Sequence, residues 1–126
     1  MVVDKNRIKP PQRQTKHHNN ADIQVHILDD RSMRKLGFTD NIPDEWYYCH
    51  IMDGSISFNV HIKKDCSDWW IDVLDEDYLQ PYDYQCSIML GRPTAYARKI
   101  KKLVDDQMLR LITHGIISNW EIGDYI

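Results

Sequence analysis

The sequence predicts an α+β fold in which a three-stranded antiparallel β-meander packs against one long C-terminal helix, with a short helix before the sheet. Two observations predict the meander. Asp53-Gly54 separates two runs in which apolar and polar residues alternate, and a third such run begins at Trp69. Apolar residues at three- and four-residue steps between Pro93 and Gly115 predict the helix. Neither element can bury its apolar side alone, so we expect the helix to cover one face of the sheet.

Length and composition indicate one ordinary globular domain. The chain has 126 residues, of which 42% are hydrophobic and 28% charged. No apolar run approaches the roughly 18 residues that a membrane span needs, and the N-terminus lacks the apolar stretch of a signal peptide. The three cysteines form no CxxC pair, which argues against a disulfide framework. We therefore expect a cytoplasmic protein that does not bind membranes.

Charge is distributed unevenly along the chain. Residues 1–20 hold five cations against Asp4 alone, a net charge of +4, whereas the rest of the chain holds 11 basic and 18 acidic side chains. Almost no aliphatic residue follows Ile8 in this stretch, so it cannot bury enough surface to offset the entropy of ordering. We expect residues 1–20 to be a disordered basic arm and residues 21–126 to form a single α+β domain. The alternative is an arm that binds nucleic acid or an acidic partner.

The segment that follows the arm has one ambiguous part and one clear part. Residues 22–28 alternate as a strand does, but their apolar side chains also fit one face of a helix, so both interpretations stay open. Asp29 or Asp30 can cap the N-terminus of a short helix that runs to Leu36. Gly37 then lies where a left-handed residue ends a helix.

The predicted meander covers residues 46–74. Its first turn is Asp-Gly, a pair favoured where both central residues of a hairpin turn need positive φ. On this hairpin we expect His50 and His61 to lie across from one another. We expect the segment after the meander, up to Gly91, to be irregular or partly helical, because Pro81 forbids regular pairing at its centre.

The long helix has an apolar face and a basic face. Pro93-Thr94 opens it and Gly115 ends it, and residues 120–126 form a final short strand or a loop. Together with the basic arm, the basic face is the candidate nucleic-acid site, although such a row is more often a solvated helix face. Its cations are Arg98, Lys99, Lys101 and Lys102.

The segment from Trp69 to Gln85 is the strongest functional signal, because it combines large aromatic side chains with carboxylates. Exposed Trp and Tyr anchor protein interfaces, so we interpret it as the contact surface of a non-enzymatic protein-interaction module. A second copy of the chain could also cover these rings, which makes a homo-oligomer an alternative. The expected partner-binding residues are Trp70, Asp75, Glu76, Asp77, Tyr78, Tyr82 and Tyr84.

No pattern in the sequence completes a catalytic, cofactor or metal site. The acidic residues near Asp75 lack the sharp-turn glycine and the terminal Glu of a calcium loop. The six histidines form no HExxH motif, and there is no GxSxG and no glycine-rich phosphate loop. A metal-dependent hydrolase built on the acidic residues is therefore the weakest hypothesis, and we expect no enzyme, no cofactor and no metal.

Two stretches, Ser55–Val60 and Ile71–Gln85, resemble small uncharacterised proteins of Gram-positive bacteria and their phages. The resemblance covers roughly residues 36–115 and leaves the basic arm outside. It supplies no activity, cofactor or catalytic residue. It implies a small cytosolic accessory or inhibitor protein encoded by a phage or prophage.

Overall fold

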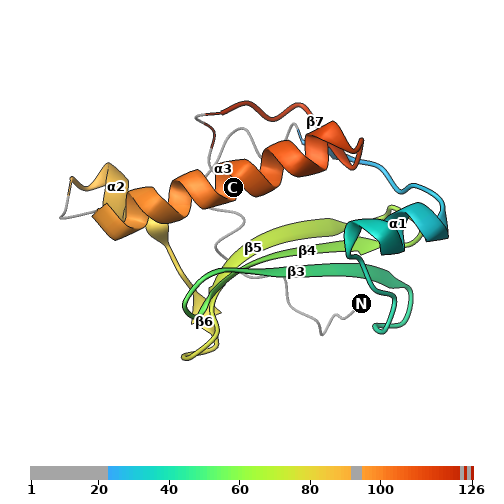
Figure 1. Ribbon diagram of the computed structural model, residues 1–126, viewed down its shortest axis with the longest axis horizontal. Helices are drawn as coiled ribbons and strands as arrows, with labels where there is room; N and C mark the ends of the chain where they lie inside the picture. Colours follow the sequence, from blue (N-terminus) through green and yellow to red (C-terminus); the bar gives the residue numbers. More distant parts are fainter. Residues whose placement is uncertain (1–22, 92–94, 123, 125) are drawn as a thin grey trace.

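The computed structural model describes residues 23–91, 95–122, 124 and 126 (Figure 1). The basic arm predicted at residues 1–20 lies outside the described residues. The helices and strands follow one another as β2 (Gln24–Val25), α1 (Asp30–Leu36), β3 (Glu45–Asp53), β4 (Ile56–Lys63), β5 (Trp69–Asp75), β6 (Gln80–Pro81), α2 (Tyr84–Met89), α3 (Ala95–Thr113) and β7 (Ile117–Ser118).

The predicted α+β class is confirmed, but the main sheet has four strands where three were predicted. Its order is β3-β4-β5-β6, and every neighbouring pair is antiparallel. The additional strand β6 places Pro81 opposite Leu74, so the expectation that Pro81 prevents pairing is wrong. Proline is tolerated because β6 is the edge strand, and the amide of Tyr82 donates to the carbonyl of Val73 at 2.9 Å.

A second sheet joins the two ends of the described chain. Val25 of β2 pairs with Ile117 of β7, and the amide of His26 donates to the carbonyl of Ile116 at 2.7 Å. Of the two interpretations of residues 22–28, the strand is therefore correct over two residues. Of the two alternatives predicted for residues 120–126, the loop is correct for the described residues, and the final strand precedes them. Gly115, with φ of 80°, turns the chain back directly after α3 and so places this strand at Ile117–Ser118.

The ends of α1 agree with the sequence signals. The Asp29 carboxylate accepts from the backbone amide of Ser32 at 2.9 Å, so Asp29 is the N-cap. Gly37 has φ of 108° and donates its amide to the carbonyl of Arg34 at 3.0 Å. A Cβ at Gly37 would lie 3.1 Å from the Tyr48 ring, so the glycine also allows α1 to approach β3 closely.

The first hairpin has a different register from the expected one. Asp53 pairs with Ile56, so Gly54 and Ser55 are the loop residues, and only Gly54 has a positive φ. A bulge between Ile51 and Asp53 then shifts the ladder. As a result His50 lies opposite Phe58, and His61 lies opposite Tyr47, so the two histidines are not cross-strand neighbours.

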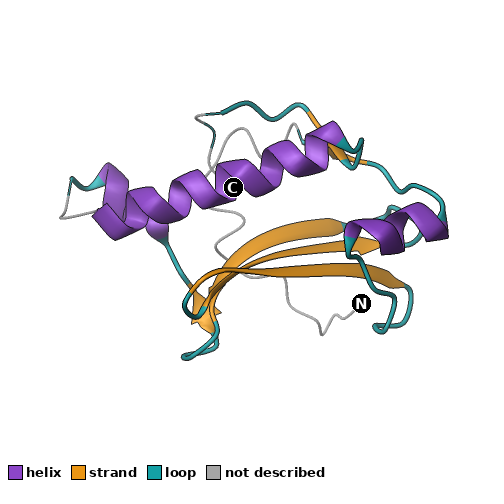
Figure 2. Cartoon of the chain, in the orientation of Figure 1, coloured by secondary structure: helices purple, strands orange, loops and turns teal. Residues whose placement is uncertain are grey.

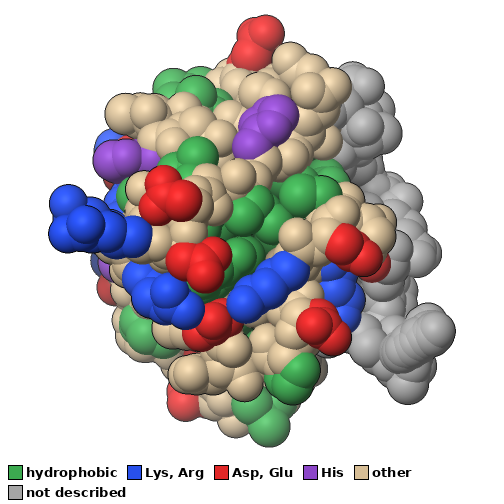
Figure 3. Space-filling view, turned by 90° about the vertical axis from the view of Figure 1, so that its right-hand side faces the viewer, with side chains coloured by type: hydrophobic (Ala, Val, Ile, Leu, Met, Phe, Trp, Pro, Cys, Tyr) green, Lys and Arg blue, Asp and Glu red, His purple; other side chains and the backbone are tan. Residues whose placement is uncertain are grey.

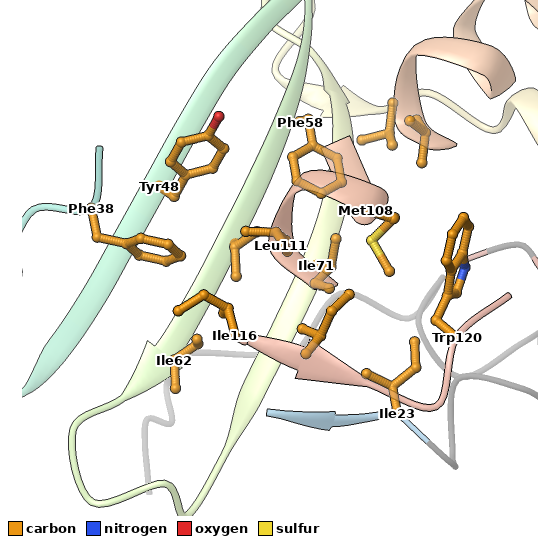
Figure 4. Packing of buried hydrophobic residues seen from close by; sticks show 14 of the residues in the cluster. Ile23, Phe38, Tyr48, Phe58, Ile62, Ile71, Met108, Leu111, Ile116 and Trp120 are labelled. Atoms are coloured by element: carbon orange, nitrogen blue, oxygen red, sulfur yellow. The ribbon is translucent and has the colours of Figure 1, made fainter. Parts of the chain in front are cut away.

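The core lies between α3 and one face of the main sheet (Figures 1 and 2). Helix α3 buries a single stripe that includes Ile100, Val104 and Met108, as its 3.6-residue periodicity predicts. Figure 4 shows Met108 and Leu111 of this stripe beside Phe58 and Ile71 of the sheet. Strand β7 and the following Trp120 close the same core from the side.

Candidate functional site

The structure divides the predicted partner-binding residues into buried and accessible ones. Trp70 and Tyr84 are only 2% and 3% exposed, so the expectation that they contact a partner directly is corrected. Trp70 stacks on His61 in the sheet, and Tyr84 starts α2 with its ring in the core cluster. Tyr78 is 74% exposed. Asp77 is also exposed, and the remaining three are half-buried: Asp75, Glu76 and Tyr82.

Hydrogen bonds and one left-handed residue fix the turn between β5 and β6, and the residues at its tip point into solvent. The Asp75 carboxylate accepts from the amide of Asp77 at 3.0 Å and from the hydroxyl of Ser55 at 3.2 Å. Leu79 has φ of 52°, a left-handed conformation that closes the turn. Tyr78 and Leu79 therefore project into solvent, and Leu79 is 84% exposed. Asp75 and Glu76 act here as turn-forming and sheet-bonding groups.

Most of the exposed large apolar side chains belong to segments at this end of the molecule, where the first hairpin turns and where α2 and the start of α3 lie (Figure 1). Nine large hydrophobic residues are exposed among the described ones, and six of them belong to this end. We call these six the hairpin-end surface. They are Ile51, Tyr78, Leu79, Met89, Leu90 and Tyr96.

Polar contacts connect the elements that carry the hairpin-end surface. The rings of Tyr82 and Tyr96 lie 6.0 Å apart, edge to face, and join the β6 region to α3. The Lys99 Nζ atom lies 3.2 Å from Asp53 Oδ1. Hydrogen bonds from Tyr96 and Lys99 hold the pKa of Asp53 below its ordinary value. Burial and the bond to Asp53 raise the pKa of Tyr96 to about 12, so its hydroxyl stays a donor at neutral pH.

The opposite end, beside α1, has a different character. Figure 3 shows Asp and Glu side chains interspersed there with Lys and Arg side chains. Asp40 Oδ2 lies 2.8 Å from the Arg34 guanidinium nitrogen Nη2 and 3.3 Å from Lys64 Nζ. Both cations also lie over the Trp46 ring. These exposed pairs neutralise one another, so this end presents no single sign of charge.

A second candidate site, absent from the sequence analysis, occupies the sheet face that points away from α3. We call it the far-face network. The antiparallel register assembles it from three strands, because it places His61 between Tyr47 and Trp70, and Asn59 opposite Asp72. Its members are Glu45, Tyr47, Ser57, Asn59, His61, Trp70 and Asp72.

Hydrogen bonds run along one side of this network. The Tyr47 hydroxyl donates to the side-chain oxygen Oδ1 of Asn59 at 2.7 Å. The side-chain Nδ2 of Asn59 donates to the Ser57 hydroxyl at 2.9 Å. The Ser57 hydroxyl in turn donates to the Glu76 carboxylate. Burial, first of all, raises the pKa of Tyr47, which keeps this phenol in its donor form.

The other side of the far-face network pairs an acid with a row of rings. His61 Nδ1 lies 2.5 Å from Glu45 Oε2, and this bond orients the imidazole. The His61 ring lies 4.6 Å from the Tyr47 ring and 4.6 Å from the Trp70 ring. Ser57 and His61 are four residues apart on one strand, about 13 Å, so the imidazole cannot activate that hydroxyl.

The basic face of α3 is largely engaged with carboxylates. Lys101 lies 2.5 Å from Asp105 and also donates to the carbonyl of Asp124 at 3.1 Å. Lys102 lies 3.9 Å from Asp106, and Lys99 pairs with Asp53 as described above. Arg98 is exposed. The row of four cations is therefore a set of mixed-charge pairs more than a positive surface.

Three further features bear on chemistry in the described part of the chain. No three His, Cys, Asp or Glu side chains converge there to hold a metal ion. All three cysteines are free and exposed. None of the helices placed by the structure combines the length and the apolar character that crossing a bilayer requires.

Comparison with known proteins gives one likeness of fold. No family model and no curated protein matches the chain. A solved structure of a DUF1831 family protein from Lactobacillus plantarum has a similar fold, with a TM-score of 0.53 and 10% sequence identity. The alignment covers 75% of this chain and 82% of that chain. The class that fold and comparison define is thus a small α+β protein with an antiparallel sheet under one long helix.

Proposed function

We propose that this chain is a non-enzymatic protein-interaction module that binds another protein through the hairpin-end surface. The observation that carries the proposal is the concentration of exposed large apolar side chains at one end, six of the nine among the described residues. Soluble monomers rarely leave such side chains together unless another surface covers them. Tyr and Leu projecting from a turn with a fixed backbone cost little entropy to bury.

The charges around the hairpin-end surface suggest the chemistry of the partner. Asp53, Asp77 and Asp83 lie on the turns that flank it, with Lys99 as the cation paired to Asp53. An apolar centre with a largely acidic border suits a partner that presents aliphatic or aromatic anchors bordered by Lys or Arg.

The biological setting of the proposal comes from the resemblance alone. The acidic-aromatic stretch Ile71–Gln85, which resembles small proteins of Gram-positive bacteria and their phages, forms the turn that carries Tyr78 and Leu79. We therefore propose a cytoplasmic accessory or inhibitor protein encoded by a phage or prophage. The partner would then be a host or phage protein.

A capture experiment with matched variants tests the proposed function. Immobilised wild-type chain, Tyr78→Ala/Leu79→Ala and Leu109→Ala/Ile122→Ala are exposed to the same bacterial lysate, and retained proteins are identified by mass spectrometry. All four positions are exposed, but the second pair lies away from the hairpin end. We expect a protein that wild type and the second variant retain and the first variant loses. Equal retention by all three chains would contradict the proposal.

A further inference from the structure

Much of the far face of the sheet, along β4 and β5 and at Glu45, is buried although the described helices lie on the other side. Figure 1 places α3, α2 and the β2–β7 pair above the sheet, and α1 packs its Met33 and Leu36 into that same core. Yet Glu45, Trp70 and Asp72, whose side chains point to the far face, are only 1%, 2% and 5% exposed. Such low exposure on the outer face of a sheet requires a further layer over it.

The far face is acidic, which suits a basic covering layer. Two nearly fully buried carboxylates, Glu45 and Asp72, are costly unless cations or donors accompany them. His61 and Lys63, the latter at 3.9 Å, lie beside Glu45. Glu76 adds a third carboxylate at the hairpin end of the same face. The rings of Tyr47, His61 and Trp70 form a strip beside these acids, in which the His61 ring stacks on Trp70 and is tilted by 38° to the Tyr47 ring.

The N-terminal segment of this chain has the complementary composition. Residues 1–22 hold five cations against Asp4 and Asp22, and they contain Pro10-Pro11. Cationic side chains and the rigid extended backbone of a proline pair are what acidic, ring-lined surfaces bind. The segment is also long enough, because 22 extended residues span up to about 73 Å, and an eight-residue strand only about 26 Å.

We propose that the far face is the docking site of this chain's own basic N-terminal segment, residues 1–22, with its cations against Glu45, Asp72 and Glu76 and its proline pair on the ring strip. This departs from the sequence prediction of a disordered arm. It does not depend on the hairpin-end surface. Docking covers the buried acids within one molecule and withdraws the arm's cations from phosphate ligands.

The native cysteines allow a direct test by paramagnetic broadening in NMR spectra of the full chain. Cys49 lies opposite Asn59 on the far face, whereas Cys86 lies on α2, on the other side of the sheet, and both thiols are exposed. Two chains are compared, each with one of these cysteines spin-labelled and the other two changed to Ser. We expect the amide signals of residues 1–22 to broaden with the label at Cys49 and to stay sharp with the label at Cys86.

Two controls separate this proposal from other occupants of the far face. Changing the arm's cations to Gln leaves the folded domain untouched, and we expect it to restore sharp signals with the label at Cys49. The changed residues are Lys5, Arg7, Lys9, Arg13 and Lys16.

The second control mixes isotope-labelled chains without a spin label and spin-labelled chains without the isotope. Broadening in that mixture would assign the far face to the arm of a second copy and overturn docking within one chain. Sharp arm signals with the label at Cys49 in the unmixed sample would overturn the proposal outright, because the arm would then lie away from the far face.

Discussion

At the scale of single residues, a few side chains and one glycine determine how closely the layers approach. Gly37 ends α1 in a left-handed conformation and leaves only 3.1 Å between its missing Cβ and the Tyr48 ring. Tyr48 in turn donates its hydroxyl to Gln107 of α3 at 2.8 Å. The same small region thus joins α1, β3 and α3, so a change at Gly37 acts on three elements.

Gly37→Ala should therefore cost more stability than a glycine change in an open turn. We expect the free energy of unfolding to fall by about 2–3 kcal/mol, from left-handed strain plus the clash with Tyr48. Gly54→Ala is the matched control, because Gly54 also has a positive φ of 53° but nothing within 4 Å of an added Cβ, and we expect about 1 kcal/mol. Urea unfolding measures both values. Equal losses would show that the ring contact is unimportant.

Tyr96 should give the hairpin-end surface a distinctive alkaline titration. Its pKa is raised from 10.0 to about 12, so the folded chain holds this proton more tightly than the unfolded chain. The stability it contributes is complete below pH 10 and is lost as the pH rises through about 12. The difference in tyrosinate absorbance between wild type and Tyr96→Phe should therefore titrate near pH 12. A difference that titrates near pH 10 would contradict the bond to Asp53.

At the scale of helices and strands, local sequence signals predicted the features that depend only on residues close together in the chain. The cap at Asp29, the left-handed Gly37 and Gly115, and the apolar stripe of α3 all follow from short-range chemistry, and the structure has each of them. Strands β6 and β7 have two residues each, too few to show alternation. Strand β6 pairs with the preceding strand β5 across a short turn, whereas β7 pairs with the distant strand β2, a contact that no local pattern contains.

The candidate site could be predicted only in part for the same reason. Tyr78 stands out in the sequence as an aromatic residue among carboxylates, and it is exposed. The far-face network depends on the register of three strands, and a shift of one residue would send His61 and Asn59 to the core. Polar residues at alternate positions 57, 59 and 61 of a strand were the available signal. The sequence held no signal for the strand pairing that joins these residues to Glu45 and Asp72.

The stripe of α3 supports a prediction at this scale. Met108 is fully buried against the sheet, whereas its neighbour Leu109 is 38% exposed. We expect Met108→Ala to lower the free energy of unfolding by about 2–5 kcal/mol, because it removes buried methylenes and leaves a cavity. Leu109→Ala should change it by no more than about 0.5 kcal/mol. Similar losses in thermal or urea unfolding would contradict the packing of α3 on the sheet.

At the scale of the whole molecule, the distribution of charge and apolar surface separates the two candidate functions. Lys99, Lys101 and Lys102 each lie beside an aspartate, which leaves Arg98 as the exposed cation of that row without such a pair among the described residues. Apolar exposure, in contrast, is concentrated at the hairpin end. The basic row of α3 therefore offers a nucleic acid few phosphate contacts, and the exposed apolar side chains of the described residues favour the proposed protein partner.

Nucleic-acid binding should accordingly be weak and depend only mildly on salt. With about one phosphate contact, the logarithm of the association constant should fall with the logarithm of salt concentration at a slope no steeper than about −1. A fluorescence anisotropy titration against DNA and RNA at several salt concentrations measures this slope. A slope of about −4 or steeper would require the basic face and the arm together, and would favour the nucleic-acid alternative.

The most direct measurement is the affinity of a purified, captured partner for three chains, determined by isothermal titration calorimetry. Burial of Tyr78 and Leu79 at the centre of an interface predicts that Tyr78→Ala/Leu79→Ala weakens binding by about tenfold or more. Leu109→Ala/Ile122→Ala should bind within about twofold of wild type, because surface changes away from an interface are nearly neutral. Equal dissociation constants for wild type and the Tyr78/Leu79 variant would contradict the assignment of the hairpin-end surface as the binding site.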